Sequence, residues 1–145
     1  IMSHSFNNIL IHAIWSTKDR QHLINFDIEK RIYQFMKQQF TDMGCFVLNI
    51  NGMPDHIHCL FLLNPTKTIN DVIKQVKGSS SHYINQQNLI SQKFSWQTGY
   101  AAYSVSQSIK GKVFDYIQNQ KSHHKKISSQ KEMDEFLELH GLKNG

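Results

Sequence analysis

The spacing of hydrophobic and polar positions predicts strands alternating with helices along the first half of the chain. Residues 8–15 are rich in β-branched and aromatic side chains, a composition that favours a strand. Apolar side chains then recur at helical spacing over residues 27–43, and Gly44 suits the position that ends a helix. Residues 45–51 form a second apolar run, and Gly-Met-Pro at 52–54 is typical of a turn. The pattern therefore predicts a strand, a helix and a second strand that enters a hairpin.

The second half of the chain repeats this alternation. Residues 56–63 form a third apolar strand, which closes the hairpin with the second. Thr68, followed three residues later by an acid, resembles a capping box, and apolar residues continue at helical spacing as far as Ile84. The aromatic segment 96–105 predicts a fourth strand. Two more helices are expected after it, at about residues 106–125 and 131–139.

This order of elements, β-α-β-β-α-β followed by helices, predicts an α+β fold of the ferredoxin-like, or split βαβ, kind. Such a fold is an antiparallel sheet with two helices on one face. Its other face is left for a ligand, a second subunit or the additional C-terminal helices. A chain of 145 residues has room for one hydrophobic core, so we expect residues 2–145 to form a single domain. Many functions use this fold, so the function has to be argued from particular residues.

The charge distribution favours a polyanionic partner. Lysine and arginine total 16 against 11 aspartate and glutamate residues, a formal net charge of +5. Residues 110–131 contain six lysines and one acid, whereas residues 132–138 contain four acids and no base. A basic stretch beside an acidic one suits a nucleic acid better than an evenly charged surface does.

Other features of composition concern the compartment. No apolar run approaches the roughly 18–20 residues that span a bilayer, and no signal-peptide pattern is present, so we expect a cytoplasmic protein with no membrane partner. Cys45 and Cys59 are too few for a disulfide framework and are expected to be buried thiols.

The first chemical signal lies at the start of the predicted third strand, in Asp55-His56-Ile57-His58. Side chains alternate across a strand, so His56 and His58 share one face while Ile57 points into the core. Two imidazoles two residues apart on a rigid strand are well placed to bind one metal ion. Ordinary half-exposed strand histidines show the same spacing, so this motif alone does not establish a metal site.

The second signal lies on the helix predicted at 106–125. Positions at i, i+3, i+4 and i+7 spacing form one stripe, which consists of Val113, Tyr116, Ile117, Gln120 and His124. A phenol, an amide and an imidazole are costly to bury without partners. Tyr116 and Gln120 are one helical turn apart. They either face a common polar site or, in the ordinary alternative, belong to a packed stripe from which the Tyr116 hydroxyl reaches solvent.

Together the two signals are compatible with a metal-assisted reaction of a tyrosine. Two histidines and an amide oxygen leave positions on a divalent ion for phosphate oxygens and water. A phenol with an ordinary pKa of about 10 is only about 0.1% ionised at pH 7, so it needs help to act as a nucleophile. Positive charge from the ion or from Lys121 would favour the phenolate, and the ion would offset charge that develops on a phosphate.

Four motifs resemble those of the insertion-sequence-200-like transposases, the small single-tyrosine members of the HUH endonuclease superfamily. The motifs are His12 to Arg20 (HAIWSTKDR), Met53 to Phe61 (MPDHIHCLF), Trp96 to Ser106 (WQTGYAAYSVS) and Tyr116 to Gln120 (YIQNQ). They occur in the family's order, and the resemblance spans roughly residues 6–124, which is nearly the whole chain.

The resemblance implies a role for each residue of the two signals. His56 and His58 would be the metal ligands of the HUH motif, Gln120 would complete the site, and the metal would be Mg²⁺ or Mn²⁺. Tyr116 would be the nucleophile that forms a 5′-phosphotyrosine link and frees a 3′-hydroxyl. Family members act as dimers, often with each tyrosine helix completing the partner's site, and recognise hairpins at the ends of a mobile element. The resemblance therefore implies a homodimeric transposase that cleaves and rejoins single-stranded DNA.

Further residues are expected to support such a site. Asp55 would orient a histidine through a hydrogen bond or, alternatively, cap the turn. Leu60 and Leu62 share the histidine face of their strand and need a cover, either the tyrosine helix or a second subunit. Aromatic side chains could stack on unpaired bases or belong to the core, namely Trp15, Trp96, Tyr100 and Tyr103. The residues expected to contact DNA phosphates, unless they form an ordinary solvated surface, are Lys18, Arg20, Lys74, Lys77 and Lys121.

Three other interpretations share parts of this pattern. A non-catalytic nucleic-acid-binding module on the same scaffold would explain the basic charge, but not the joint occurrence of the His-Ile-His and Tyr-Ile-Gln-Asn-Gln motifs. A host-adopted transposase relative acting on repeated palindromes would use the same chemistry. Replication initiators and relaxases of the superfamily commonly have a third histidine where this chain has Gln120, and relaxases are larger.

Overall fold

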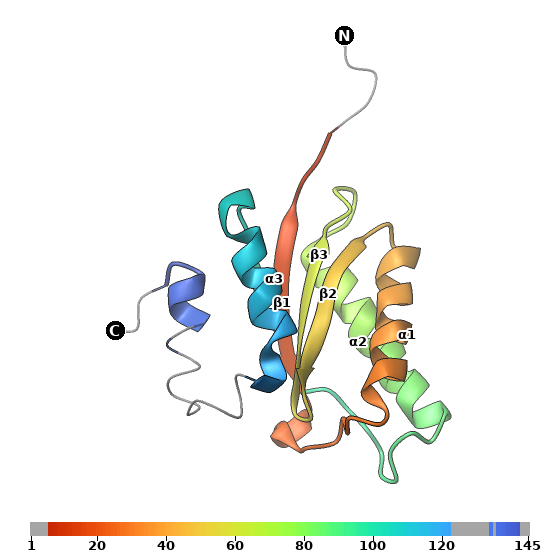
Figure 1. Cartoon of the computed structure of the whole chain (residues 1–145). Coiled ribbons are helices and arrows are strands. Elements are labelled where there is room, and N and C mark those ends of the chain that lie inside the picture. The colour runs from red at the N-terminus through yellow and green to blue at the C-terminus, as the bar shows by residue number, and fades with distance from the viewer. Residues whose placement is uncertain (1–5, 123–133, 135, 143–145) are drawn as a thin grey trace.

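A four-stranded antiparallel sheet forms the centre of the structure, a computed structural model that describes residues 6–122, 134 and 136–142. Its strands are β1 (Leu10–Ser16), β2 (Phe46–Met53), β3 (His56–Leu62) and β4 (Ala101–Ser104), in the spatial order β2-β3-β1-β4. Helices α1 (Glu29–Asp42) and α2 (Ile69–Gln86) lie on one face, and α3 (Lys110–Gln118) lies on the other (Figure 1). This arrangement is the ferredoxin-like fold, so the predicted α+β architecture is confirmed.

Side-chain alternation along β3 explains why both faces of the sheet are covered. Ile57, Cys59 and Phe61 are fully buried in the larger core, on the face packed against α1 and α2. Leu60 and Leu62 point to the opposite face and pack in a second cluster with residues of α3. The cover that these two leucines require is therefore the tyrosine-bearing helix of the same chain.

Local interactions fix the ends of two helices. The Thr68 hydroxyl accepts a hydrogen bond from the backbone N–H of Asp71 at 3.1 Å, so the predicted N-cap of α2 is confirmed. Caps of this kind stabilise a helix by about 1 kcal/mol. Gly44 follows α1 with a φ of 76°, a conformation that favours glycine. In the described part of the chain, no helix combines the length and the apolar character needed to cross a membrane.

The fourth strand is shorter than its aromatic composition predicts. Within the predicted range 96–105, only Ala101–Ser104 pairs with β1, while Trp96 forms an isolated bridge. Residues 97–100 form a loop in which Gly99 has a φ of 90°. Trp96 is buried in the larger core, so its aromatic ring reflects core filling and not a continuing strand.

The hairpin between β2 and β3 also differs from the prediction. Met53 pairs with His56, so the connecting turn consists of Pro54 and Asp55, and not of residues 52–54. The second strand therefore extends two residues further than the predicted 45–51, whereas the third begins at His56 as predicted. As a consequence, Asp55 occupies the turn itself, directly before the first histidine of β3.

The helix predicted over residues 106–125 is divided into shorter parts. A 3₁₀ turn, η2 (Gln107–Ile109), precedes α3, and Asn119, with φ −96° and ψ 19°, follows the last residue of α3. Residues 120–122 form a further helical turn, and the remainder of the predicted helix, including His124, lies outside the described residues. Of the last predicted helix, residues 134 and 136–139 are helical where the structure describes them.

Candidate active site

Two histidines of β3 face the helix that carries the tyrosine. His56 is 6% exposed and His58 is 3% exposed, so neither is a half-exposed strand histidine of the ordinary kind. Their ring centroids are 5.2 Å apart. The Tyr116 ring lies 5.6 Å from the His58 ring, nearly perpendicular to it. The imidazole pair and the phenol therefore meet within a single chain.

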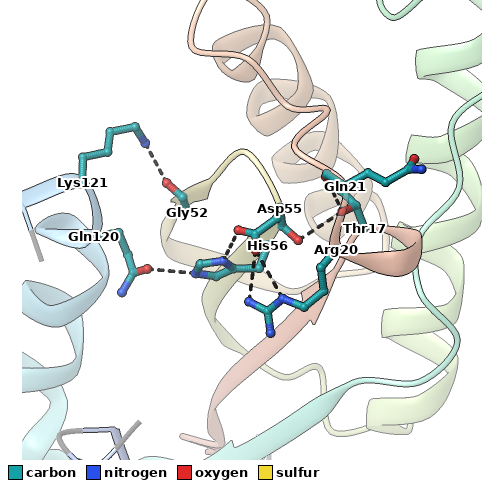
Figure 2. Close-up of polar contacts among 8 residues, drawn as sticks. All are labelled: Thr17, Arg20, Gln21, Gly52, Asp55, His56, Gln120 and Lys121. Carbon is teal, nitrogen blue, oxygen red and sulfur yellow. Dashed lines mark hydrogen bonds and ion pairs between the residues drawn. The ribbon is translucent and has the colours of Figure 1, made fainter. Parts of the chain in front are cut away.

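His56 is contacted at both ring nitrogens (Figure 2). Its Nδ1 lies 2.7 Å from Asp55 Oδ1, and its Nε2 lies 3.1 Å from Gln120 Oε1. The guanidinium of Arg20 donates to the other carboxylate oxygen of Asp55, from Nε at 3.2 Å and from Nη2 at 3.1 Å. Arg20, Asp55, His56 and Gln120 thus form a continuous polar chain from the η1 turn (Lys18–Arg20) to the segment after α3.

The charge on Asp55 follows from these contacts. Burial alone would raise its pKa, but the hydrogen bond with His56 and the positive charge of Arg20 hold that pKa well below its usual range. The ionised carboxylate can only accept, so the proton on His56 is held at Nδ1. The backbone oxygen of Asp55 also accepts from the Thr17 N–H at 2.9 Å. The Asp55 side chain therefore makes the contact to a histidine that was considered from the sequence, while its backbone oxygen ties the hairpin turn to the end of β1.

The donor set fits a divalent cation. With the proton of His56 at Nδ1, the lone pair of Nε2 faces the carbonyl oxygen of Gln120, which is also an acceptor. Their 3.1 Å separation is close to the distance of about 3.0 Å between neighbouring ligands of an octahedral ion with bonds of roughly 2.1 Å. Gln120 Nε2 is buried and has no hydrogen-bond partner among the described residues, as expected if the amide is placed for its oxygen.

The amide of Gln120 differs in kind from the imidazole, thiolate and carboxylate groups that form most metal sites. Within the part of the chain that the structure describes, no three His, Cys, Asp or Glu residues are grouped so that they could hold a metal ion. A site at His56 and His58 therefore needs a neutral third ligand, and Gln120 is in position to supply one.

His12 of β1 belongs to the same site, although it was not among the predicted site residues. Its side chain is 0% exposed, its Nε2 lies 2.9 Å from His58 Nδ1, and its Nδ1 lies 2.7 Å from His140 Nε2. Burial, together with the charge of His140, lowers the pKa of His12 to about 3, so the ring is neutral at physiological pH. A signal was present, because His12 alternates with Leu10 and Ile14 on the face opposite the larger core. Only the register between β1 and β3 reveals its partner.

A cavity of about 730 Å³ opens beside these residues. His56, His58 and Tyr116 line one part of it, and the loop 97–100 lines another. Of the four aromatic residues considered from the sequence, Trp15 and Trp96 are buried in the larger core. The others lie in the cavity wall, where Tyr103 is half-buried and Tyr100 is 37% exposed. Trp15 also borders this cavity although it is only 3% exposed, so Tyr100 and Tyr103 are the two with more surface open to a ligand there.

The predicted phosphate-contacting residues fall into two groups. Lys18 and Lys74 are exposed, and the Arg20 side chain remains 66% exposed although it pairs with Asp55. By contrast, Lys77 Nζ donates to two backbone oxygens of the cavity loop, that of Gln97 at 2.8 Å and that of Gly99 at 2.7 Å. Burial lowers the pKa of Lys77.

Lys121 is held by the β2–β3 hairpin. Its Nζ donates to Asn51 Oδ1 at 2.7 Å and to Gly52 O at 2.9 Å, the contact drawn in Figure 2, and pairs with Glu29 at 3.1 Å. These contacts tie the segment that carries Gln120 to the strand that precedes the histidines.

The ferredoxin-like sheet carries a histidine pair on β3, and α3 with the turn after it brings a tyrosine and an amide against that pair. This combination defines a class of small transposases, and similarity to known proteins leads to the same class. The chain belongs to the family described as "Transposase IS200 like", whose model matches residues 5–120. It is therefore a transposase, and its family implies cleavage and strand transfer of DNA.

One relative is similar to the chain in sequence, and two solved structures are similar to it in fold. The chain is 25% identical over 114 residues to the ISDra2 transposase TnpA of Deinococcus radiodurans, a match that covers 75% of this chain and 81% of the relative. A crystal structure from Deinococcus radiodurans, described as that of a transposase, is similar in fold with a TM-score of 0.65 and 23% identity, over 83% of this chain and 95% of the other. A REP-associated tyrosine transposase bound to a REP hairpin gives a TM-score of 0.64 at 12% identity, over 86% and 74% of the two chains.

Proposed function

We propose that this transposase cleaves and rejoins single-stranded DNA, with Tyr116 as the nucleophile and a divalent cation, Mg²⁺ or Mn²⁺, held by His56, His58 and Gln120. The observation that carries the proposal is the 3.1 Å approach of His56 Nε2 to Gln120 Oε1, with the Tyr116 ring beside His58 in the same cavity. A phenol and a cation-binding donor set would then act on the same phosphate.

The reaction balances without an external energy source. Tyr116 Oη forms a bond to the scissile phosphorus, the bond between phosphorus and the 3′-oxygen breaks, and the 3′-oxygen leaves as a hydroxyl that carries the proton lost by the phenol. The product is a 5′-phosphotyrosine, which a 3′-hydroxyl of another strand can attack in the reverse sense. The cation, when bound, polarises the phosphate and offsets the charge that develops during the transfer.

The chain's own residues prepare this step. Asp55 holds the proton of His56 on Nδ1, which directs the lone pair of Nε2 toward Gln120. Tyr116 lies on α3 and Gln120 in the helical turn that follows Asn119, and the contacts of Lys121 with Asn51 and Gly52 hold that turn against the β2–β3 hairpin. Both histidines are largely buried and line the cavity, so the donor set is partly shielded from bulk water, which strengthens its electrostatics.

For the substrate we propose single-stranded DNA that carries hairpins at the ends of a mobile element. The basic charge of the chain and the fold shared with a hairpin-bound tyrosine transposase support this choice. We further propose that the protein acts in the cytoplasm. We also propose that it is a homodimer, because a mobile element has two ends that must be held together.

Substitution of the nucleophile tests the mechanism. With Mn²⁺ and hairpin-bearing single-stranded DNA, the wild-type protein is expected to form a covalent protein–DNA adduct that survives denaturing electrophoresis. Tyr116→Phe should form none, because the reacting oxygen is absent, and a chelator should remove the adduct from the wild type. Tyr100→Phe is the matched control, since Tyr100 lines the same cavity and should keep the adduct.

Two results would contradict the proposal. An adduct of normal yield with Tyr116→Phe would show that another residue is the nucleophile. Tight hairpin binding without any adduct, under every metal condition, would favour the non-catalytic binding module.

A further inference from the structure

His12 lies beside a proposed metal ligand but has no role in the chemistry described above. The register places it opposite Leu60, so His58 is its diagonal neighbour on the same face of the sheet. The resulting contact between His12 Nε2 and His58 Nδ1 is 2.9 Å long, and a second contact of 2.7 Å joins His12 Nδ1 to His140 Nε2. Three imidazoles therefore form a row in which the middle ring uses both of its nitrogens.

The protons in such a row have only two consistent arrangements. Two ring nitrogens at hydrogen-bond distance share one proton, and a neutral imidazole carries one N–H in all. If His58 Nδ1 donates to His12 Nε2, then His12 Nδ1 donates to His140 Nε2, and His58 Nε2 keeps its lone pair. In the opposite arrangement the proton of His58 sits on Nε2, which then cannot bind a cation.

We propose that His12 is a positioning residue that accepts the Nδ1 proton of His58 and so presents His58 Nε2 to the divalent cation. This inference rests on the proposed function, because it assumes that His58 is a ligand. His12 would do for His58 what Asp55 does for His56, since each histidine ligand has its Nδ1 against one partner. Partners of this kind orient the ligand ring and fix its tautomer.

The two partners differ in charge, and this has a consequence. Asp55 is a carboxylate, whereas His12 is an imidazole, 0% exposed, with the Phe136 ring 5.7 Å away. The site therefore gains orientation at His58 without a second negative charge close to the scissile phosphate. A ring that only filled space at this position would need no nitrogen directed at His58.

The test compares His12→Gln with His12→Leu. Glutamine keeps an acceptor for His58 and a donor for His140, whereas leucine suits the apolar surroundings of the ring but removes both hydrogen bonds. The measurements are the Mn²⁺ affinity of the full chain without DNA, by calorimetry or electron paramagnetic resonance, and the side-chain nitrogen shifts of His58 with and without Mg²⁺. Both are independent of DNA cleavage.

We expect the wild-type protein to bind Mn²⁺. We expect His58 to be the Nδ1–H tautomer both before and after the cation is added. His12→Leu should bind Mn²⁺ about 10–100-fold more weakly and show mixed tautomers, and His12→Gln should restore affinity to within a few-fold. If the wild type binds Mn²⁺ and both variants bind it equally well, the inference about His12 is overturned and the metal site stands. If the wild type binds no Mn²⁺, the proposed metal site itself fails. Should His12→Leu not fold, an Nε2–H tautomer of His58 in the wild type would still overturn the inference.

Discussion

At His56, two side-chain contacts decide which ring nitrogen remains for a ligand. Asp55 holds Nδ1 at 2.7 Å, and Gln120 presents an amide oxygen to Nε2 at 3.1 Å. The contact with Asp55 also depends on a residue distant in sequence, because Arg20 holds the carboxylate in place. The chemistry of one imidazole is thus set by three neighbours from three parts of the chain.

Replacing this carboxylate tests its effect on the cation. Asp55→Asn removes the negative charge and allows an amide N–H to face His56 Nδ1, which would favour the wrong tautomer. We expect Mn²⁺ affinity to fall about 10–100-fold, as measured by calorimetry. Asp27→Asn, at an exposed acid outside the site, is the control and should bind as the wild type does. Equal affinities for both variants would remove Asp55 from the site.

The stability of the same variant should depend on pH in one direction. The folded-state pKa of Asp55 lies below its unfolded value, so its contribution is complete above the unfolded pKa and is lost as the pH falls toward the folded one. The difference in unfolding free energy between wild type and Asp55→Asn should therefore be full at pH 7 and shrink below about pH 4.

Among the elements, the β2–β3 hairpin is the one that places the histidines. Gly52 pairs with Ile57, and the strands approach so closely there that a Cβ on Gly52 would lie 2.2 Å from His56 O and 2.9 Å from Ile57 Cα. Both are backbone atoms, so the clash can be relieved only by opening the hairpin. A glycine in β2 is therefore a requirement for the position of His56.

This requirement gives a prediction with an internal control. Gly52→Ala should lower the free energy of unfolding by about 1–3 kcal/mol, because the added methyl group forces the strands apart. Gly78→Ala should raise it by about 0.5–1 kcal/mol, because Gly78 lies inside α2 and an added Cβ would meet no atom within 4 Å beyond its chain neighbours and the backbone of the helix itself. Urea denaturation measures both, and a neutral effect of Gly52→Ala would disprove the close approach.

Two lysines of α2 differ in role: Lys77 holds the loop 97–100, whereas Lys74 is exposed to solvent. Lys77→Met should release the loop 97–100 and destabilise the protein by about 1–3 kcal/mol, because two charge-assisted hydrogen bonds to backbone oxygens are lost. Hydrogen exchange at the Gly99 and Tyr100 amides should become faster. Lys74→Met, at an exposed position on the same helix, should change neither quantity. If both variants instead weaken DNA binding alike and leave the loop unchanged, Lys77 is a phosphate contact.

For the molecule as a whole, net charge sets the response to salt. With a formal charge of +5 and exposed basic residues near the cavity, DNA binding should involve several phosphate contacts. Affinity for hairpin-bearing single-stranded DNA should fall as salt rises, with a log–log slope of about −0.7 for each neutralised phosphate. Fluorescence anisotropy over a salt series measures the slope, and a flat response would refute an electrostatic interface.

Several features of the fold could be predicted because their causes are local. The caps at Thr68 and Gly44, the alternation along β3 and the helical spacing of α1 depend only on residues close in sequence. The fourth strand was overestimated for a physical reason, since an aromatic residue such as Trp96 favours strands and buried loops alike. Asn119 likewise has no strong local signal for the interruption that follows α3.

The sequence by itself determined the order of elements and the faces on which His56, His58 and Tyr116 lie, because strand and helix periodicity fixes the direction of side chains within one element. Only the tertiary structure decided which faces meet. The Asp55–Arg20 pair, the approach of Gln120 to His56 and the row through His12 all join residues far apart in the chain. Their distances depend on strand register and on the position of α3 on the sheet. Both are set by packing of the whole chain and not by any local preference.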